Sequence, residues 1–329
     1  MVETWDVVIA GGAAMGSSLA CHLMAEPGFS GRVLVIERDR TYAQAASALS
    51  ASSIRQQFSQ PVNIAISLHG IAFLREIGDR LAVDGDRPDI GLREGGYLYV
   101  AHDHGFAVLK ENHVAQVALG ADIALMDRSA LAARFPFLST DDLAGGSFGV
   151  SGEGWFDGYQ LMQAFGRKAR SLGAVYREAE VAGVDRQGDH IAAITLSDGS
   201  RIACGAFVNC AGAWGARTIA AHCGVPLPVY AKKRSVFSWT CQTKLSGFPL
   251  LIDTSGVWCR PEGEGFIGGY SPPDDSETDE GRDFDVNWHE FDEVIWPSLA
   301  VRIPAFEAIR PGRAWAGHYD MNLFDHNAV

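Results

Sequence analysis

The chain has 329 residues, a formal net charge of −13 and 47% hydrophobic residues. This length exceeds the size at which one hydrophobic core keeps growing, so two domains are expected. The acidic balance, without a run rich in lysine and arginine, argues against a nucleic-acid-binding surface, because contacts with phosphates need clustered cations. We therefore expect the partner to be a small molecule.

Six cysteines are scattered along the chain without a CxxC pair. This usage predicts reduced, mostly buried thiols, no metal site and a cytoplasmic protein. The uncharged segment 7–25 is long enough for a membrane helix, but its adjacent glycines and the strand that follows fit a nucleotide-binding fold better. No membrane span is expected, and acidic Glu3 and Asp6 argue against a signal peptide.

The N-terminal segment has the pattern of a βαβ dinucleotide-binding unit. An apolar strand at 7–10 leads through glycines into a helix, and a second strand at 33–37 ends in the acid Glu37. Gly11 allows a tight turn where a Cβ would clash, and Gly16 lets the helix lie close to the sheet. The helix N-terminus is expected to face a pyrophosphate, and Glu37 to accept hydrogen bonds from the ribose hydroxyls of adenosine.

The glycine pattern departs from G-x-G-x-x-G at one position, where Ala13 replaces the middle glycine. Its methyl group narrows the approach of phosphate, so Gly12 is expected to supply part of the clearance. A glycine triplet alone could also be a tight turn without a ligand. Dinucleotide binding is favoured because strand, turn, helix, strand and acid follow in the required order.

The next part of the chain alternates between small-residue loops and regular elements. Residues 41–61 are rich in alanine and serine, with Arg55 as their only charge, and they must lie against another part of the protein. The apolar spacing of 62–80 predicts a helix, and 94–101 reads as a strand entered through two glycines. Residues 136–149 are predicted to form a turn-rich connection.

Beyond residue 150 the pattern predicts an amphipathic helix that ends at Gly173, followed by a strand at 175–181. Two strands are expected about the turn Asp198–Gly199, and a third is expected to end in the small residues 211–213. A strand end made of small residues is a second place where a ligand could approach the backbone.

The segment 225–309 contains further strand-like stretches and an acidic loop at 274–285, which is most simply a solvated surface. The strand-like stretches carry the large aromatic residues Trp239, Trp258 and Phe266.

Four patches, Ile9–Ser18, Ala51–Gln57, Phe207–Gly215 and Ala314–Asn327, together resemble one family. It is the D-amino acid oxidase superfamily of FAD-dependent oxidoreductases, which includes glycine oxidase, sarcosine oxidase and proteins like dimethylglycine dehydrogenase. The order and separation of the patches match that family over nearly the whole chain. The relatives continue beyond the point where this chain stops, so a C-terminally truncated fragment is expected.

The resemblance implies an α/β fold, α+β overall, in which a Rossmann-like FAD-binding domain is interleaved with a mixed-sheet substrate domain. The FAD-binding domain is expected to comprise 1–90, 145–224 and 310–329. The substrate domain is expected to comprise 91–144 and 225–309.

The resemblance also implies a set of FAD-binding residues at the matching positions. The FAD is expected to be non-covalent, because Gly317 and His318 stand before Tyr319 where some relatives carry a cysteine. The expected cofactor-binding residues are Gly11, Gly12, Ala13, Ala14, Met15, Gly16, Glu37, Arg38, Ser50, Ala51, Ser52, Arg55, Gln56, Val181, Ala211, Gly212 and Trp214.

Four residues are expected to take part in catalysis if the resemblance holds. A reduced flavin develops negative charge near N1 and C2=O, which the guanidinium of Arg55 would stabilise. Arg260 could hold a substrate carboxylate with two hydrogen bonds. His318 could accept a proton near neutral pH, and Tyr319 could hydrogen-bond the substrate or close the pocket.

The sequence departs from some sarcosine oxidases at two functional positions. Phe58 stands where they carry a second arginine, and the stretch 265–270 has no lysine of the kind they use for oxygen chemistry. The substrate and the electron acceptor, either oxygen or an electron carrier, therefore stay open.

The favoured function is oxidation of the C–N bond of a small amine or amino acid, similar to sarcosine or glycine, by hydride transfer to flavin N5. The imine formed would then hydrolyse in water. The alternative is a flavin-containing assembly or scaffold protein that does not turn over amines. A nicotinamide-dependent dehydrogenase fits the first motif alone, but Phe207–Gly215 and the loop that carries Arg55 argue against it.

Overall fold

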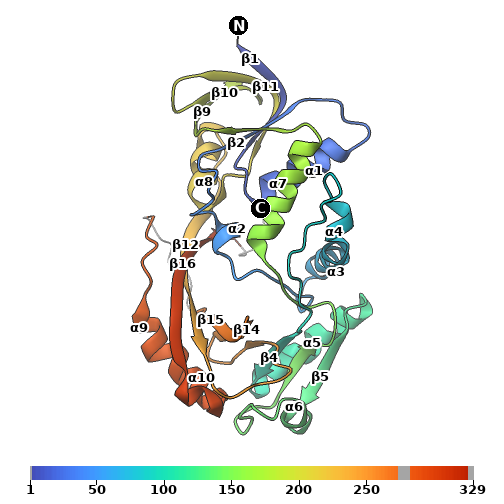
Figure 1. The fold of residues 1–329 in the computed structure, drawn as a ribbon, viewed down its shortest axis with the longest axis vertical. Coiled ribbons are helices and arrows are strands. Elements are labelled where there is room, and N and C mark those ends of the chain that lie inside the picture. Colours follow the sequence, from blue (N-terminus) through green and yellow to red (C-terminus); the bar gives the residue numbers. More distant parts are fainter. Residues whose placement is uncertain (1, 273–281, 325–329) are drawn as a thin grey trace.

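A computed structural model describes residues 2–272 and 282–324. Two β-sheets lie one above the other along the long axis of the molecule (Figure 1). The upper sheet has six strands in the order β8-β2-β1-β11-β10-β9. Their bounds are β1 Glu3–Ala10, β2 Val33–Glu37, β8 Val175–Glu178, β9 Val181–Gln187, β10 His190–Leu196 and β11 Arg201–Asn209.

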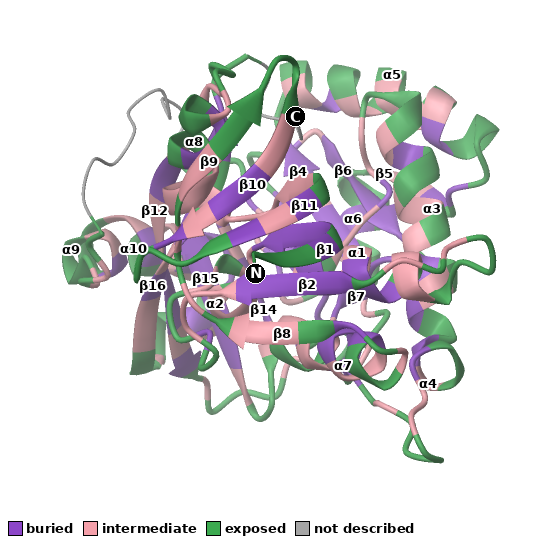
Figure 2. Cartoon of the chain, turned by 90° about the horizontal axis from the view of Figure 1, so that it is seen from above, coloured by how far each residue is buried: buried purple, intermediate pink, exposed green. Residues whose placement is uncertain are grey.

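The four strands β8, β2, β1 and β11 run parallel, and β10 and β9 continue the sheet as an antiparallel hairpin. Side chains of β1 alternate between the two faces of this sheet, as a strand period of two requires. Ile9 packs with helices α1 (Ala14–Ala25) and α7 (Gly158–Ser171), whereas Val8 belongs to the cluster on the other face. Burial on both faces explains why β2 is almost entirely apolar (Figure 2).

The lower sheet has eight strands in the order β16-β12-β15-β14-β13-β4-β6-β5. In this order β16 and β12 form a long antiparallel pair, which runs from Val229 opposite Asn322 to Thr240 opposite Arg310. The bounds are β4 Tyr97–Ala101, β5 Ile123–Asp127, β6 Gly145–Gly149, β12 Val229–Thr240, β13 Leu250–Ile252, β14 Val257–Glu262, β15 Gly265–Tyr270 and β16 Arg310–Asn322.

An aromatic core fixes the helices that follow β15 against this lower sheet. Phe306 stacks edge-on against Phe266 and Trp239 with ring centroids 4.8 and 5.8 Å apart, and all three rings are buried. The elements of the lower half outside the sheet are α5 Asp103–Ala118, α6 Arg128–Arg134, α9 Trp288–Glu290, the π-helix η1 Phe291–Ile295, α10 Trp296–Arg302 and the 3-10 helix η2 Pro304–Ala308.

The remaining elements join these strands along the chain. They are α2 Ala46–Leu49, β3 Ser53–Ile54, α3 Pro61–Arg75, α4 Ile77–Arg80, β7 Gly154–Trp155 and α8 Gly212–His222. The strands β3 and β7 pair with each other and thereby join the alanine- and serine-rich stretch 41–61, called the serine-rich loop below, to the segment after β6.

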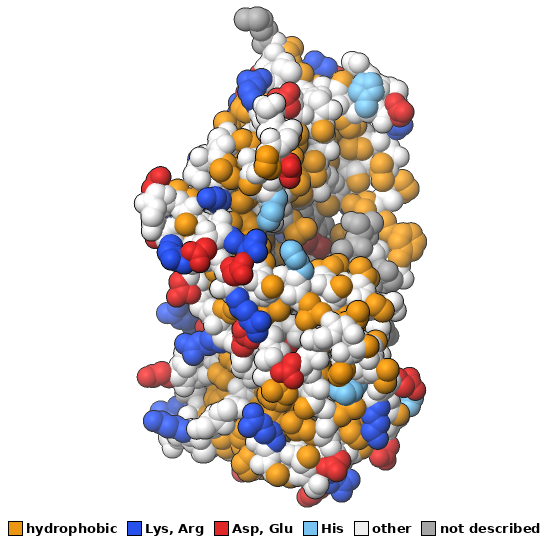
Figure 3. All heavy atoms as spheres, turned by 90° about the vertical axis from the view of Figure 1, so that its right-hand side faces the viewer, with side chains coloured by type: hydrophobic (Ala, Val, Ile, Leu, Met, Phe, Trp, Pro, Cys, Tyr) orange, Lys and Arg blue, Asp and Glu red, His pale blue; other side chains and the backbone are white. Residues whose placement is uncertain are grey.

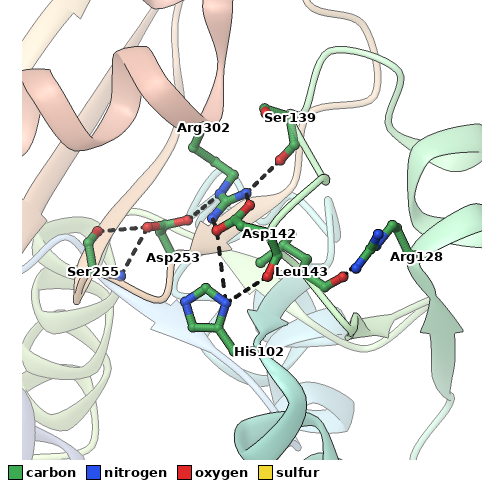
Figure 4. A network of polar contacts seen from close by, with 8 residues as sticks. All are labelled: His102, Arg128, Ser139, Asp142, Leu143, Asp253, Ser255 and Arg302. Carbon is green, nitrogen blue, oxygen red and sulfur yellow. Dashed lines mark hydrogen bonds and ion pairs between the residues drawn. The ribbon is translucent and has the colours of Figure 1, made fainter.

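A buried arginine ties two distant segments of the lower half together (Figure 4). The Nε atom of Arg302, at the end of α10, donates to Asp253 at 2.6 Å, and its Nη atoms donate to both oxygens of Asp142 at 2.7 and 2.8 Å. The Arg302 side chain is 4% exposed and that of Asp253 is 5% exposed, so this pair is shielded from solvent. Hydrogen bonding to Arg302 lowers the pKa of Asp142.

The structure corrects several predicted elements. The predicted connection at 136–149 ends in strand β6, which was missed because its glycines are typical of a turn. The structure needs glycine there, since added Cβ atoms at Gly145 and Gly146 would meet neighbouring backbone oxygens. The predicted helix at 62–80 is divided at Glu76 into α3 and α4. A single strand, β11, extends from the turn to Asn209, so the expected third strand is not separate from it.

Two strands belong to a different sheet from the other strands of the domain to which they were assigned. Strands β6 and β16 belong to the eight-stranded sheet, although 145–149 and 310–322 were assigned to the FAD-binding domain. Hydrogen bonding of β16 along β12 is the physical reason for its place in the lower half. Of the acidic loop predicted at 274–285, the part 274–281 lies outside the described residues.

Candidate functional site

The turn between β1 and α1 brings the backbone close to the end of β11. Gly11 has φ +96°, and a Cβ added to it would overlap the carbonyl oxygen of Cys210. A Cβ at Gly16 would overlap the carbonyl oxygen of Gly11. Helix α1 then begins after Ala13, whose side chain has no polar atom to cap the first N–H groups. This is the geometry in which a helix N-terminus receives an anionic group.

Glu37 stands at the end of β2 beside the same turn. Its Oε2 accepts a hydrogen bond from the backbone N–H of Gly12 at 2.8 Å, and its Oε1 accepts one from the N–H of Asp39 at 3.0 Å. These two bonds fix the carboxylate, and each oxygen keeps a second acceptor site. Glu37 can therefore accept hydrogen bonds from the hydroxyl groups of a ligand in the cavity that it lines.

A cavity of about 290 Å³ extends from this turn between the loop after β2 and the start of α8. Helix α8 begins after Ala211, so a second helix start with an alanine cap faces this cavity. Nine predicted cofactor-binding residues line it, namely Gly11, Ala13, Met15, Glu37, Arg38, Val181, Ala211, Gly212 and Trp214.

A second cavity of about 670 Å³ lies between the serine-rich loop and the face of the lower sheet. The residues Ala46, His318 and Asp320 line both cavities, so the two spaces meet at α2 and β16. On the face shown in Figure 3 the molecule is hollowed at about mid-height. The predicted residues that line the second cavity are Ser50, Ala51, Ser52, Arg55, His318 and Tyr319.

Arg55 is placed in the wall of the second cavity by three aromatic rings. Its guanidinium carbon lies 4.8 Å from the ring centroid of Phe58 and 5.9 to 6.0 Å from those of Tyr99 and Tyr97. Burial raises the pKa of both tyrosines, so their hydroxyls stay neutral. Among the described residues, no hydrogen-bond acceptor reaches Nε of Arg55.

The residues of β16 form the junction of the two cavities. His318 is 6% exposed, and its ring meets Trp214 and Phe284 edge-on, with centroids 4.8 and 4.7 Å apart. Tyr319 is half exposed, with the guanidinium of Arg234 over its ring at 5.8 Å. Burial raises the pKa of Asp320, which also accepts a hydrogen bond from the backbone of Ala213 at the start of α8.

Arg260 is buried, and its guanidinium is bound to other residues of the protein. It is 4% exposed, stacks over Trp155, pairs with Glu262 and donates to the carbonyl oxygen of Ala51 at 2.8 Å. It is not among the described residues that line either cavity. Its predicted role in holding a substrate carboxylate does not fit this position, because the guanidinium already binds Glu262 and the carbonyl oxygen of Ala51.

Four other predicted cofactor-binding residues are absent from the described linings, namely Gly12, Ala14, Gly16 and Gln56. Gly12 and Gly16 pack against other parts of the protein at the turn. Gln56 is buried, and its side-chain amide donates a hydrogen bond to the carbonyl oxygen of Gly152. A strand-end motif identifies the elements that surround a cavity, but it does not tell which of their residues face it.

Several lining residues were missing from the predicted site. The residues after Glu37 could have been predicted, because the chain that leaves β2 must pass the nucleotide site. No motif in the sequence pointed to Arg282. The additional residues in the first cavity include Tyr42, Ser47, Ala179, Glu180 and Arg282.

This arrangement suits a dinucleotide better than a small ligand. Two helix starts and the close turn at Gly11 are in the first cavity, an acid that accepts hydroxyls stands at its edge, and a roomier cavity opens from it. Fold and site together define a dinucleotide-binding protein with a second, eight-stranded sheet beside the nucleotide site.

The chain belongs to the family described as FAD dependent oxidoreductase, whose model matches residues 6–329. It is 39% identical over 362 aligned positions to FAD-dependent oxidoreductase domain-containing protein 1 of Bos taurus, covering 99% of this chain and 74% of that protein. The protein of the same description from Xenopus laevis is 38% identical, with 99% and 72% covered. The family resemblance and the FAD cofactor are thereby confirmed.

Solved structures with the same fold confirm the predicted fold class. L-proline dehydrogenase from P. horikoshii has a TM-score of 0.84 at 22% identity, with 98% of this chain and 83% of that chain covered. Glycine oxidase from Geobacillus kaustophilus has a TM-score of 0.82 at 22% identity, with 99% and 85% covered.

Two searches of the described residues complete the description of the site. Within 2–272 and 282–324, the helices are too short or too polar to cross a bilayer. In the same part of the chain, no group of three or more histidine, cysteine or acidic side chains is arranged to hold a metal ion.

Proposed function

We propose that the protein oxidises the C–N bond of a small amine or amino acid. The observation that carries this proposal is the second cavity, which opens onto the cofactor cavity and has a guanidinium, that of Arg55, in its wall. The names of the similar structures support the substrate class, because a proline dehydrogenase and a glycine oxidase share this fold.

FAD would supply the two-electron chemistry, by taking a hydride from the carbon next to the amine nitrogen. The two helix starts and Glu37 would hold its nucleotide end, and the loop Ser50–Arg55 would lie beside its ring. The FAD is proposed to be non-covalent, since Gly317 packs tightly against Leu49 and offers no side chain for attachment.

The chain's own residues would mainly position the substrate. Arg55 and Arg234 contribute positive charge to the second cavity, which suits a substrate that carries a carboxylate. The amine has to be neutral to lose the hydride, and the released imine hydrolyses in water, so little acid–base machinery is required. The walls that exclude water include Tyr97, Leu250, Ile252, Trp258 and Tyr270.

The test is anaerobic reduction of the FAD-loaded protein by sarcosine, glycine, proline and dimethylglycine. Bleaching of the flavin absorbance by at least one of them, at a rate that saturates with its concentration, is the expected result. If none of a broad panel of amines bleaches the flavin, the proposal fails and the scaffold function gains. Reoxidation in air, compared with reoxidation by an artificial carrier, then decides between oxygen and an electron carrier.

A cytoplasmic location remains a prediction. All six thiols are free, which agrees with a reducing compartment. Fractionation of cells that produce the protein would test it.

A further inference from the structure

A buried carboxylate stands directly behind the loop that carries Arg55. Glu153 lies between β6 and β7 and has no exposed surface. A Cβ added to Gly149 would overlap the Oε2 atom of Glu153, so the space for this carboxylate exists because residue 149 is glycine. A charged group fully shielded from water is costly to the fold unless it is paired or hydrogen-bonded.

The carboxylate accepts three hydrogen bonds, all from the two residues that follow Arg55. Its Oε1 accepts the backbone N–H groups of Gln56 and of Gln57, the latter at 3.1 Å. Its Oε2 accepts the side-chain amide of Gln57 at 2.8 Å. Three donors from one short loop thus converge on a single side chain, which fixes the path of the backbone just beyond Arg55.

Other contacts also hold this loop, because β3 pairs with β7 just before Arg55 and the side-chain amide of Gln56 donates to the carbonyl oxygen of Gly152. Arg55 leans on rings, and its Nε has no acceptor among the described residues. Glu153 is the charged anchor of the backbone directly after Arg55, so it contributes to the position of the guanidinium in the cavity wall.

Glu153 also carries the negative charge that acts on Arg55. Burial raises the pKa of Glu153 to about 7, against the opposing effects of the hydrogen bonds from Gln56 and Gln57 and of the positive charge of Arg55. The other titratable groups that act on it are the hydroxyls of Tyr97 and Tyr99, on β4, and both stay neutral. The neighbouring acid Glu94 is directed to the N–H of Gly152 and to Arg75.

We propose that Glu153 is a positioning residue that holds the loop 55–57 and thereby sets where Arg55 stands, with one proton on Glu153 loosening the loop and leaving the charge of Arg55 uncompensated. Protonation weakens the hydrogen bonds because a neutral acid is a poorer acceptor than a carboxylate. The side-chain oxygen of Gln57 has no hydrogen-bond partner among the described residues, and after a flip of the amide group it accepts a hydrogen bond from the protonated Glu153 carboxyl. This inference rests on the proposed place of Arg55 beside the flavin ring.

The first test measures hydrogen exchange at the amides of Gln56 and Gln57 in the FAD-loaded protein between pH 6 and pH 8. After correction for intrinsic exchange, protection in the wild type should fall several-fold as the pH decreases through about 7. Glu153→Gln should lower the protection and make it independent of pH. Unchanged protection in Glu153→Gln, or the same pH dependence as in the wild type, would overturn the positioning role.

The second test follows the visible spectrum of bound FAD over the same pH range. A one-proton transition is expected in the wild type, with its loss in both Glu153→Gln and Arg55→Gln. Glu76→Gln, an exposed carboxylate that pairs with Arg80, is the matched control and should keep the transition. A flat wild-type titration, or a transition that persists in Glu153→Gln, would overturn the coupling to Arg55. Neither test uses a substrate, so failure of amine oxidation would not be mistaken for failure of this inference.

Discussion

Arg55 is the charged side chain of the serine-rich loop, and its surroundings explain why it can act without being neutralised. Three rings surround the guanidinium, and cation–π contacts hold a charge in place without removing it. An ion pair with a directly bound carboxylate would instead cancel much of the field that Arg55 directs into the cavity. Glu153 acts on it from behind the loop.

Arg55→Ala should slow reduction of the flavin by an amine roughly 100-fold, the typical effect of removing one preorganised donor from an active site. FAD should stay bound, because the nucleotide cavity is formed by other elements. Stopped-flow absorbance under anaerobic conditions measures the rate. Arg87→Ala, an exposed arginine paired with Asp79, is the control and should reduce normally. Complete loss of FAD in Arg55→Ala would instead assign the residue a structural role.

Glu153 should also leave a signature in stability. Burial raises its pKa to about 7 from the ordinary 4.5, so between these pH values the folded protein binds more protons than the unfolded chain. The contribution of Glu153 to the free energy of unfolding is therefore present at low pH and is lost as the pH rises through this window, by up to roughly 3 kcal/mol. Glu153→Gln should thus gain stability relative to the wild type between pH 5 and pH 8.

Urea denaturation at the two pH values measures this difference. The prediction would be contradicted if the gap between variant and wild type were the same at both. Glu76→Gln serves again as the control, because an exposed carboxylate should not produce such a gap.

At the scale of single elements, the turn between β1 and α1 depends on glycine at one position more than at the next. Gly11 combines a positive φ with contact to the backbone of Cys210, and neither can be relieved by a side-chain movement. A Cβ on Gly12 would meet side-chain atoms of Glu37, Tyr42 and Val35 at 3.2 Å, which small shifts can accommodate.

Gly11→Ala should therefore lower the free energy of unfolding by roughly 3 kcal/mol and abolish FAD binding, because the turn must open. Gly12→Ala is the matched control and should retain FAD with a modest loss of affinity. Quenching of FAD fluorescence measures binding, and thermal unfolding measures stability. Equal behaviour of the two variants would show that steric overlap at Gly11 is not what shapes the turn.

Elements with a local sequence pattern could be predicted from the sequence. Elements whose conformation depends on close packing of backbone from distant segments could not. Apolar β1 and β2, the turn at Gly11 and the acid Glu37 were predicted because their pattern is local. Strand β6 was missed, since its glycines read as a turn although they permit close packing against β4 and β5. The family resemblance predicted that Arg55 lies beside the flavin ring, and the structure has it in the wall of the second cavity. The hydrogen bond from Arg260 to Ala51 could not be predicted, because the two residues are far apart in the sequence.

At the scale of the whole molecule, the cluster around Arg302 keeps the two chain segments of the lower half together (Figure 4). Asp253 lies at the end of β13, Asp142 precedes β6, and Arg302 ends α10. Removing one partner of a buried ion pair leaves a charge without compensation, which costs more than the pair itself contributes.

Arg302→Leu should lower the free energy of unfolding by roughly 3–5 kcal/mol, because it strands the buried Asp253. Asp142→Asn should cost less than about 1 kcal/mol, since Asp142 is half exposed. Urea denaturation of both variants gives the comparison. A larger effect for Asp142→Asn than for Arg302→Leu would mean that the exposed contact, rather than the buried one, joins the segments.

Strand β16 is hydrogen-bonded to the lower sheet along β12, yet it sends His318 and Asp320 into the space beside the nucleotide-binding turn. The two compartments therefore share side chains through which a molecule bound in one can affect binding in the other. Thermodynamic reciprocity requires that any molecule whose affinity is increased by FAD also increases the affinity for FAD by the same factor. Cofactor retention during dialysis would then report on ligands of the neighbouring compartment before any turnover is measured.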